Sequence, residues 1–225
     1  MIDVRRSKER GYFDFGWLKT FHTFSFGEYR DLRFMGYEKL RVLNEDYVAP
    51  GKGFGTHGHR DMEIVTYVIS GALAHKDSMG NGSVIKPGDV QRMSAGTGVE
   101  HSEFNHSSDE EVHLLQIWFI PDKKGIAPGY EQKFFENEKK KDRLCTLVTP
   151  DGRDGSLRMS SSSYFYSSIL SQGKRLTAEA KKSWLHVIDG EIEVEGHRLS
   201  GGDSASLDNP HISAIRDSHF ILIQF

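Results

Sequence analysis

The chain has 225 residues, which is enough for one large domain or two small ones. Its 29 Lys and Arg residues nearly balance 32 Asp and Glu residues, so a dedicated nucleic-acid-binding protein is not expected. The longest apolar stretches, around Leu114–Ile120 and Phe220–Phe225, are far shorter than the roughly 18 residues that a membrane-spanning helix needs. The charged N-terminus does not resemble an export signal, and the single cysteine, Cys145, excludes an intrachain disulfide. A cytoplasmic protein is therefore expected.

Short strands are predicted along the whole chain. The runs Glu63–Ile69, Val112–Phe119, Trp184–Ile188 and Phe220–Phe225 are rich in β-branched and aromatic residues, and most of them end near Gly, Pro or Asp. Helical periodicity is weak everywhere, and its best candidate is Glu131–Lys141. Closely spaced short strands of this kind predict an all-β protein built as a sandwich or barrel.

An internal repeat indicates a duplicated barrel. In both Tyr67–Val90 and His186–Ser204 an apolar strand ends at Gly, a second strand follows, and a Gly-Asp turn opens a third. The two glycines are 17 positions apart in the first copy and 12 in the second, and the extra residues fall in Asp77–Gly82, a predicted hairpin tip. Ordinary turn chemistry is the alternative explanation of the pattern.

The joint between the two copies is expected within Pro121–Arg143. This stretch is rich in Lys and Glu and contains a Pro-Gly turn, and its interleaved charges indicate a solvated surface rather than a nucleic-acid patch. We therefore predict an N-terminal metal-binding barrel over residues 1–132 and a C-terminal barrel without metal ligands over residues 133–225.

The candidate chemistry lies in the first copy. His57 and His59 are two positions apart, and on a strand such side chains lie about 6.5 Å apart on one face. His101 and Glu103 repeat the spacing further along the chain. Two neighbouring strands would bring the four side chains to one point. Three nitrogens and one oxygen suit Fe(II), Mn, Co, Ni, Cu or Zn rather than Ca or Mg.

Other candidate residues are assigned structural roles. Cys145 is expected to be a small buried hydrophobe. Core or loop positions with ordinary hydrogen bonds are expected for four histidines, His22, His75, His106 and His113. Surface positions are expected for His197 and His219.

Several motifs together resemble a known family. Gly51-x5-His57-x-His59-x3-Glu63 is similar to the first cupin motif, and Gly98-x2-His101-x3-Asn105 is similar to the end of the second. The segments HTFSF at 22–26, GFGTH at 53–57, DSMG at 77–80 and MSAGTG at 93–98 resemble the pirin family. The resemblance is dense from Gly16 to Trp118, and it is strongest to short bacterial pirin-like proteins known as quercetin 2,3-dioxygenases.

The resemblance implies two cupin barrels, the first of which binds one divalent transition metal through His57, His59, His101 and Glu103, with Fe(II) as the first choice. One departure concerns Glu63, which comes one residue early for the usual cupin glutamate. We expect Glu63 to orient a histidine rather than to bind the metal. In the second copy the corresponding positions, counted back from Gly190, hold Leu176 and Ala178, and His211 is interpreted as the remnant of a ligand.

The resemblance further implies a metal-dependent dioxygenase that opens the heterocycle of a flavonol such as quercetin and releases carbon monoxide. Glu103 would be the catalytic base that accepts the substrate's hydroxyl proton. The expected partners are a flavonol-like substrate and dioxygen, with no nucleic acid and no membrane. The alternative is a non-enzymatic regulatory protein, because the vertebrate pirins that the chain resembles act as metal-dependent co-regulators of transcription factors. Under this alternative a protein partner is also expected.

Overall fold

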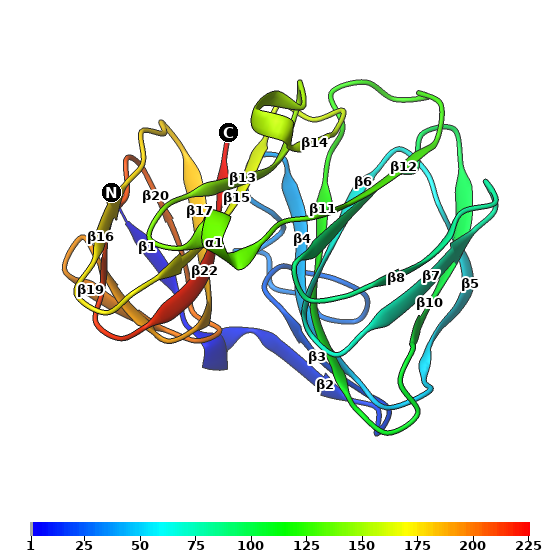
Figure 1. Ribbon diagram of the computed structural model, residues 1–225, viewed down its shortest axis with the longest axis horizontal. Helices are drawn as coiled ribbons and strands as arrows, with labels where there is room; N and C mark the ends of the chain where they lie inside the picture. The colour runs from blue at the N-terminus through cyan, green and yellow to red at the C-terminus, as the bar shows by residue number, and fades with distance from the viewer. Residues whose placement is uncertain (1) are drawn as a thin grey trace. The chain divides into compact units, whose positions relative to one another are not determined.

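The computed structural model describes residues 2–225 and is built almost entirely of short antiparallel strands (Figure 1). It divides into two compact units. The N-terminal unit contains Gly11–Phe135 and Leu157–Ser161, and the C-terminal unit contains residues 2–10, Glu136–Ser156 and Ser162–Phe225. No helix within residues 2–225 has the length and apolar character needed to cross a membrane.

The N-terminal unit has two facing sheets. Its strands are β2 (Gly11–Asp14), β3 (Leu18–His22), β4 (Leu40–Val48), β5 (Gly53–His59), β6 (Glu63–Ser70), β7 (Leu73–Asp77), β8 (Gly82–Ile85), β9 (Asp89–Ser94), β10 (Val99–Asn105), β11 (Val112–Phe119) and β12 (Gly129–Phe134). The large sheet has the order β12-β9-β6-β11-β4-β3-β2, and the small sheet has the order β5-β10-β7-β8. This is the all-β barrel that the strand pattern predicts.

The C-terminal unit repeats the plan. Its elements are β1 (Asp3–Arg5), η1 (Ser7–Glu9), α1 (Asn137–Lys140), β13 (Cys145–Thr149), η2 (Arg153–Gly155), β15 (Tyr164–Leu170), β16 (Arg175–Thr177), β17 (Ser183–Asp189), β18 (Glu191–Val194), β19 (His197–Ser200), β20 (Ser204–Leu207), β21 (His211–Ala214) and β22 (Ser218–Gln224), while the two-residue strand β14 (Leu157–Arg158) lies in the segment assigned to the other unit. The large sheet runs β1-β20-β17-β22-β15-β13 and the small sheet β16-β21-β18-β19.

Local details confirm the duplication. Ile69 is skipped in the pairing of β6 with β11, and Ile188 is skipped in the pairing of β17 with β22, each two residues before a glycine. Those glycines, Gly71 and Gly190, have φ of 75° and 89°. An added Cβ would lie 2.7 Å from the carbonyl oxygen of Glu111, just before β11, and 2.3 Å from that of Asp217, just before β22. Both copies therefore use a bulge followed by a glycine that no larger residue can replace without strain.

The strand predictions are confirmed, but the helix candidate Glu131–Lys141 is wrong over most of its length. Glu131 to Phe134 belong to β12 and pair with β9, and only Asn137–Lys140 forms a single helical turn. Cross-strand pairing at a sheet edge outweighs the weak helical pattern. The expected domain boundary between residues 132 and 133 stays a prediction. The pairing of β1 with β20 of the C-terminal unit was not predicted from the sequence.

A row of polar side chains crosses the large sheet of the N-terminal unit. Paired positions on β3, β4, β11, β6 and β9 place His22 opposite Asn44, Asn44 opposite Gln116, Gln116 opposite Thr66 and Thr66 opposite Gln91. We call these five residues the polar row. Directly paired residues share a face of the sheet, so the row lines one side of the barrel.

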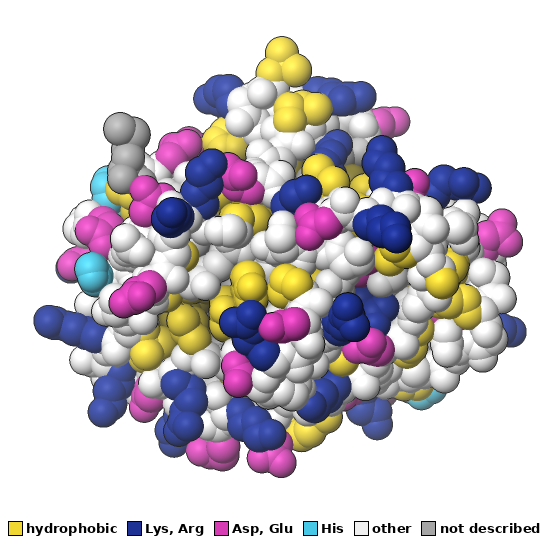
Figure 2. All heavy atoms as spheres, turned by 90° about the horizontal axis from the view of Figure 1, so that it is seen from above, with side chains coloured by type: hydrophobic (Ala, Val, Ile, Leu, Met, Phe, Trp, Pro, Cys, Tyr) yellow, Lys and Arg dark blue, Asp and Glu magenta, His cyan; other side chains and the backbone are white. Residues whose placement is uncertain are grey.

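On the face in view, Figure 2 shows basic side chains interspersed with acidic ones.

Candidate metal centre

Three histidines converge at one end of the small sheet. His57 and His59 lie two positions apart on β5, and β10 places His101 directly opposite His57. The Nε2 atoms of His57 and His101 are 3.1 Å apart. Ring centroids are 4.8 Å apart for His57 and His59 and 4.9 Å apart for His59 and His101. The i, i+2 spacing on a strand therefore brings the predicted imidazoles together.

The ring of His57 is held in one orientation. Its Nδ1–H donates a hydrogen bond to the carbonyl oxygen of Gly55 at 2.8 Å. With the proton on Nδ1, Nε2 keeps its lone pair toward His101, which is the arrangement that a metal-binding histidine needs.

Glu103 follows His101 by two positions on β10 and is buried. The side-chain amide of Gln116 donates a hydrogen bond to Oε2 at 2.9 Å, and the hydroxyl of Thr66 makes a longer one to Oε1 at 3.4 Å. Glu103, His101 and His75 each offer a ligand atom within 4.8 Å of the others, as His57, His59 and His101 do. The four predicted ligands thus fall in two overlapping groups that share His101.

The electrostatics of the cluster fit a cation. Burial, together with the neighbouring histidines, lowers the pKa of His59 to about 4 and of His101 to about 3, so both rings are neutral near pH 7. Burial, with a smaller contribution from Asp46, raises the pKa of Glu103 to about 7. Neutral imidazoles and a buried carboxyl group are the donors that divalent transition metals select. The residues present therefore fit such an ion.

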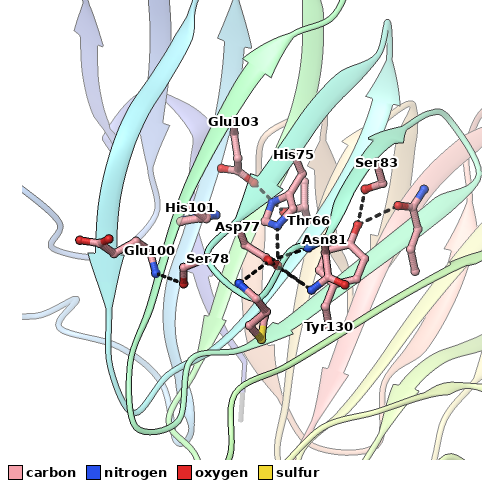
Figure 3. Close-up of polar contacts among 12 residues, drawn as sticks. Thr66, His75, Asp77, Ser78, Asn81, Ser83, Glu100, His101, Glu103 and Tyr130 are labelled. Atoms are coloured by element: carbon pink, nitrogen blue, oxygen red, sulfur yellow. Dashed lines mark hydrogen bonds and ion pairs between the residues drawn. The ribbon is translucent and has the colours of Figure 1, made fainter.

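His75 lies beside the cluster within a buried polar network (Figure 3). Its Nε2 is 3.3 Å from Oδ2 of Asp77, while Oδ1 of Asp77 accepts hydrogen bonds from the backbone N–H groups of Met79 and Asn81. These contacts close the hairpin tip that the sequence predicts. His75 is the hydrogen-bonded core residue expected, but its place next to Glu103 was missed. His75 of β7 pairs directly with Glu103 of β10, and this neighbour could not be predicted without knowing how the two strands align.

Glu63 does not orient a histidine, so that expectation is wrong. Its side chain is buried and its Oε2 accepts a hydrogen bond from the hydroxyl of Ser94 at 2.8 Å. Arg92 and the backbone of Ser160 also stabilise the carboxylate, and Glu63 belongs to neither ligand group. Glu63 faces β9 because it pairs directly with Ser94 at the start of β6.

The C-terminal unit offers no comparable group among the described residues. His211 is not a remnant of a ligand, because its side chain is 66% exposed and lies 3.4 Å from the carboxylate of Glu195. The neighbouring Ile212 is the residue that faces the core, where it pairs with Leu176 and Val194. His219, expected at the surface, is half-buried and forms a hydrogen bond with Ser167.

Two cavities that share lining residues lie in the N-terminal unit, and each also has exposed residues in its lining. The first, the imidazole cavity, has a volume of ≈ 270 Å³ and is lined by His57, His59, Glu103, Gln116 and Trp118, with Phe26, Asn44, Asp46 and Phe54. The second, the phenylalanine chamber, has a volume of ≈ 300 Å³ and shares those last four residues. Neither cavity was predicted from the sequence. The polar residues that interrupt the apolar strands were the feature that could have indicated them.

Comparisons with known proteins agree with the geometry. The pirin family matches residues 3–119, and a family described as the quercetinase C-terminal cupin domain matches residues 146–225. Quercetin 2,3-dioxygenase of Escherichia coli (strain K12) is 42% identical over 229 residues, which cover 100% of this chain and 98% of the relative. The crystal structure of YhhW from Escherichia coli has a TM-score of 0.96 at 40% identity, covering 100% of this chain and 97% of that one.

A second crystal structure bears on the metal. It is described as bacterial pirin YhhW from Escherichia coli in complex with nickel(II), and it has a TM-score of 0.95 at 40% identity, covering 100% of this chain and 99% of that one. A putative quercetin 2,3-dioxygenase of Pasteurella multocida (strain Pm70) is 37% identical, covering 99% of this chain and 98% of the relative.

Proposed function

The chain belongs to the pirin family, and from this premise we propose that its N-terminal unit is a metal-dependent dioxygenase that opens the heterocycle of a flavonol such as quercetin and releases carbon monoxide. The observation that carries the proposal is the pair of donor groups that share His101, beside a cavity that His57, His59 and Glu103 line. The name of the Escherichia coli relative supplies the substrate class.

We propose that His57, His59, His101 and Glu103 hold one divalent transition metal ion. Fe(II) remains the first choice from the sequence, and the nickel(II) complex of a relative makes Ni(II) the second. When bound, such an ion supplies Lewis acidity that favours the ionised form of the substrate's 3-hydroxyl group. One ion per chain is expected because the C-terminal unit lacks the donors.

The residues around the centre perform the remaining tasks. We propose that Glu103 also accepts the hydroxyl proton. Burial raises its pKa to about 7 in the metal-free centre, and a bound cation would lower that pKa. Gln116 and Thr66 fix the direction of its two oxygens. Trp118 packs edge-on against His59 with ring centroids 4.8 Å apart, and it places apolar surface against one side of the centre, where His57 remains exposed.

A regulatory protein with a metal in a purely structural role would need no cavity beside the ligands. Here the imidazole cavity and the adjoining phenylalanine chamber provide space at the centre, which favours the enzyme. A cytoplasmic location and the absence of nucleic-acid and membrane partners remain predictions from the sequence.

The decisive experiment measures dioxygen uptake and carbon monoxide release with quercetin. Purified protein loaded with Fe(II), Ni(II), Mn(II), Co(II) or Cu(II) should consume dioxygen and release carbon monoxide in equal amounts. Flavones that lack the 3-hydroxyl group should not react, because they offer no ionisable oxygen. The proposal fails if no metal supports turnover above the free-metal background, or if turnover survives in His59→Ala.

A further inference from the structure

The phenylalanine chamber is lined by aromatic rings and also by buried polar side chains. Three side chains that line it each hold a buried atom without a hydrogen-bond partner, namely Nδ1 of His22, Oδ1 of Asn44 and Oδ1 of Asp46. The three residues are 7%, 3% and 5% exposed. The Asp46 carboxyl group is also hydrogen-bonded to Thr20, and the His22 ring to the backbone of Phe26. Leaving a buried polar atom unsatisfied costs about 1–3 kcal/mol, so three of them in one chamber require an explanation.

The three atoms are placed together by strand pairing. On β3 and β4 the paired positions put His22 opposite Asn44 and Thr20 opposite Asp46. Alternation along β4 then turns Asn44 and Asp46 to the same face of the sheet, which also lines the imidazole cavity. Asn44 and Asp46 therefore line both cavities, and His22 lines the chamber.

Aromatic rings form the rest of the chamber. Phe13 and Phe15 are stacked at an interplanar angle of 5° with centroids 6.0 Å apart. Phe13 also packs on His22 at 5.4 Å, and Phe26 meets the other side of the region with its ring edge-on to His22 at 5.3 Å. Rings in these arrangements favour a flat aromatic guest.

The size of the imidazole cavity points in the same direction. At ≈ 270 Å³ it falls just below the ~300 Å³ at which pockets for drug-sized ligands begin, whereas the two adjoining cavities together lie within that range. A three-ring flavonol held at the metal by its 3-hydroxyl group thus needs space beyond the imidazole cavity.

We propose that the phenylalanine chamber receives a hydroxylated aryl ring of the substrate, whose phenolic O–H groups donate hydrogen bonds to Asn44 and Asp46 and contact His22. This inference rests on the flavonol substrate class proposed above. It makes the enzyme selective for polyhydroxylated flavonols over 3-hydroxyflavone, which carries the metal-binding oxygens without the other hydroxyl groups. Unpaired acceptors in a built site discriminate strongly in favour of the ligand that supplies the donor.

Binding is measured without turnover, by titrating nickel(II)-loaded protein with quercetin or 3-hydroxyflavone in the absence of dioxygen. Quenching of tryptophan fluorescence reports occupancy, measured in a background in which Trp17 and Trp184 are replaced by Phe so that the signal comes from Trp118 of the imidazole cavity. Wild-type protein should bind quercetin roughly tenfold more tightly than 3-hydroxyflavone. Asn44→Leu and His22→Leu should each reduce this ratio roughly threefold, and the double variant should bring it close to one.

Two further readouts separate a binding role from a structural one. His219→Leu removes a half-buried imidazole of the C-terminal unit that is hydrogen-bonded to Ser167, and it should leave the ratio unchanged. Asn44→Leu replaces an unsatisfied buried group by an apolar one, so its melting temperature should stay equal to the wild-type value or rise. Nickel content measured for each variant confirms that the centre is intact.

The outcomes distinguish this inference from the proposed function. A wild-type ratio near one, or a ratio that the chamber variants leave unchanged, overturns the inference even if carbon monoxide is released. A ratio that falls in the chamber variants supports the inference even if quercetin is bound without being cleaved, in which case only the dioxygenase proposal fails. No binding of either flavonol overturns both.

Discussion

The two barrels share one strand plan and differ in what lies on it. The N-terminal polar row has its counterpart in the C-terminal unit, where paired positions connect β13, β15, β22, β17 and β20. The counterpart row is, in the same order, Thr146, Tyr166, Leu222, Leu185 and Ala205. The polar row therefore holds Glu103 in the N-terminal unit, whereas most of the counterpart row belongs to the apolar core of the C-terminal unit.

The small sheets differ in the same way. In the N-terminal unit Glu103 of β10 lies opposite His75 of β7, while in the C-terminal unit Ile212 of β21 lies opposite Val194 of β18. The backbone pairing is the same, and the side chains decide between a ligand group and a core cluster. The comparison teaches that the strand plan does not depend on the donors, because the C-terminal unit adopts it without a comparable group among the described residues.

The largest effect is expected from removing a ligand. His101→Ala should reduce metal content from one ion per chain to near zero and lower activity by more than the roughly hundredfold that is typical of residues around the ligands. The fold should persist, since the C-terminal unit adopts the same strand plan with apolar side chains in place of the donors. Elemental analysis and circular dichroism check both points, and full metal content in the variant would contradict the assignment.

Moving polarity into the second barrel should come next. Leu222→Gln places an amide at the position equivalent to Gln116, but in a fully buried apolar cluster that offers no partner. The free energy of unfolding should fall by about 3 kcal/mol. Chemical denaturation measures this, with Ile215→Gln at a half-buried position as the control. Unchanged stability would mean that the two cores do not differ as described.

The pH dependence that His22 contributes should have no counterpart at the equivalent position of the second barrel. Burial lowers the pKa of His22 to about 4, whereas its counterpart Thr146 does not titrate. The unfolded chain takes up a proton on His22 below its ordinary pKa of about 6.5, and the folded chain does so only near 4. Metal-free wild-type protein should therefore lose about 2 kcal/mol relative to His22→Leu between pH 7 and pH 4.5. Calorimetry of the two proteins tests this, and parallel pH profiles would refute it.

A smaller effect is expected from the polar row itself. Gln116→Leu, which copies the residue of the second barrel, removes the donor to Oε2 of Glu103. Metal affinity should weaken by roughly tenfold to hundredfold, because an orienting partner is lost while all ligands remain. Competition with a chelator gives the affinity. An affinity equal to that of the wild type would show that Glu103 needs no help from the row.

The smallest effect on the centre is expected at Glu63. Glu63→Gln keeps the size of the side chain, and its contacts are Ser94 and Arg92 rather than any ligand. Metal affinity should change by less than about threefold, while stability falls by roughly 1–2 kcal/mol because Arg92 loses a charged neighbour. Chelator competition together with thermal unfolding separates the two quantities. A tenfold loss of metal affinity would reinstate Glu63 as a partner of the ligands.

The sequence was sufficient wherever the signal is local. The H-x-H spacing, the alternating strands and the repeated Gly-to-Gly unit depend on neighbours in the chain, and the structure contains each of them. The polar row was not predictable, because Asn44, Thr66 and Gln116 come together only through the register of three strands. The fate of Glu63 was missed for the same reason, since strand parity gives the face but not the neighbour.

The pairing of β1 with β20 has a consequence for biosynthesis. The first of these strands is made on the order of 200 residues before its partner, so at ~5–20 residues per second it waits roughly 10–40 s on the ribosome. Arg6 and Ser7 next to it also await Asp203, which they bind at 2.9 and 2.7 Å. The N-terminal barrel can close during this interval, whereas the C-terminal barrel must capture a segment synthesised before the whole of its neighbour.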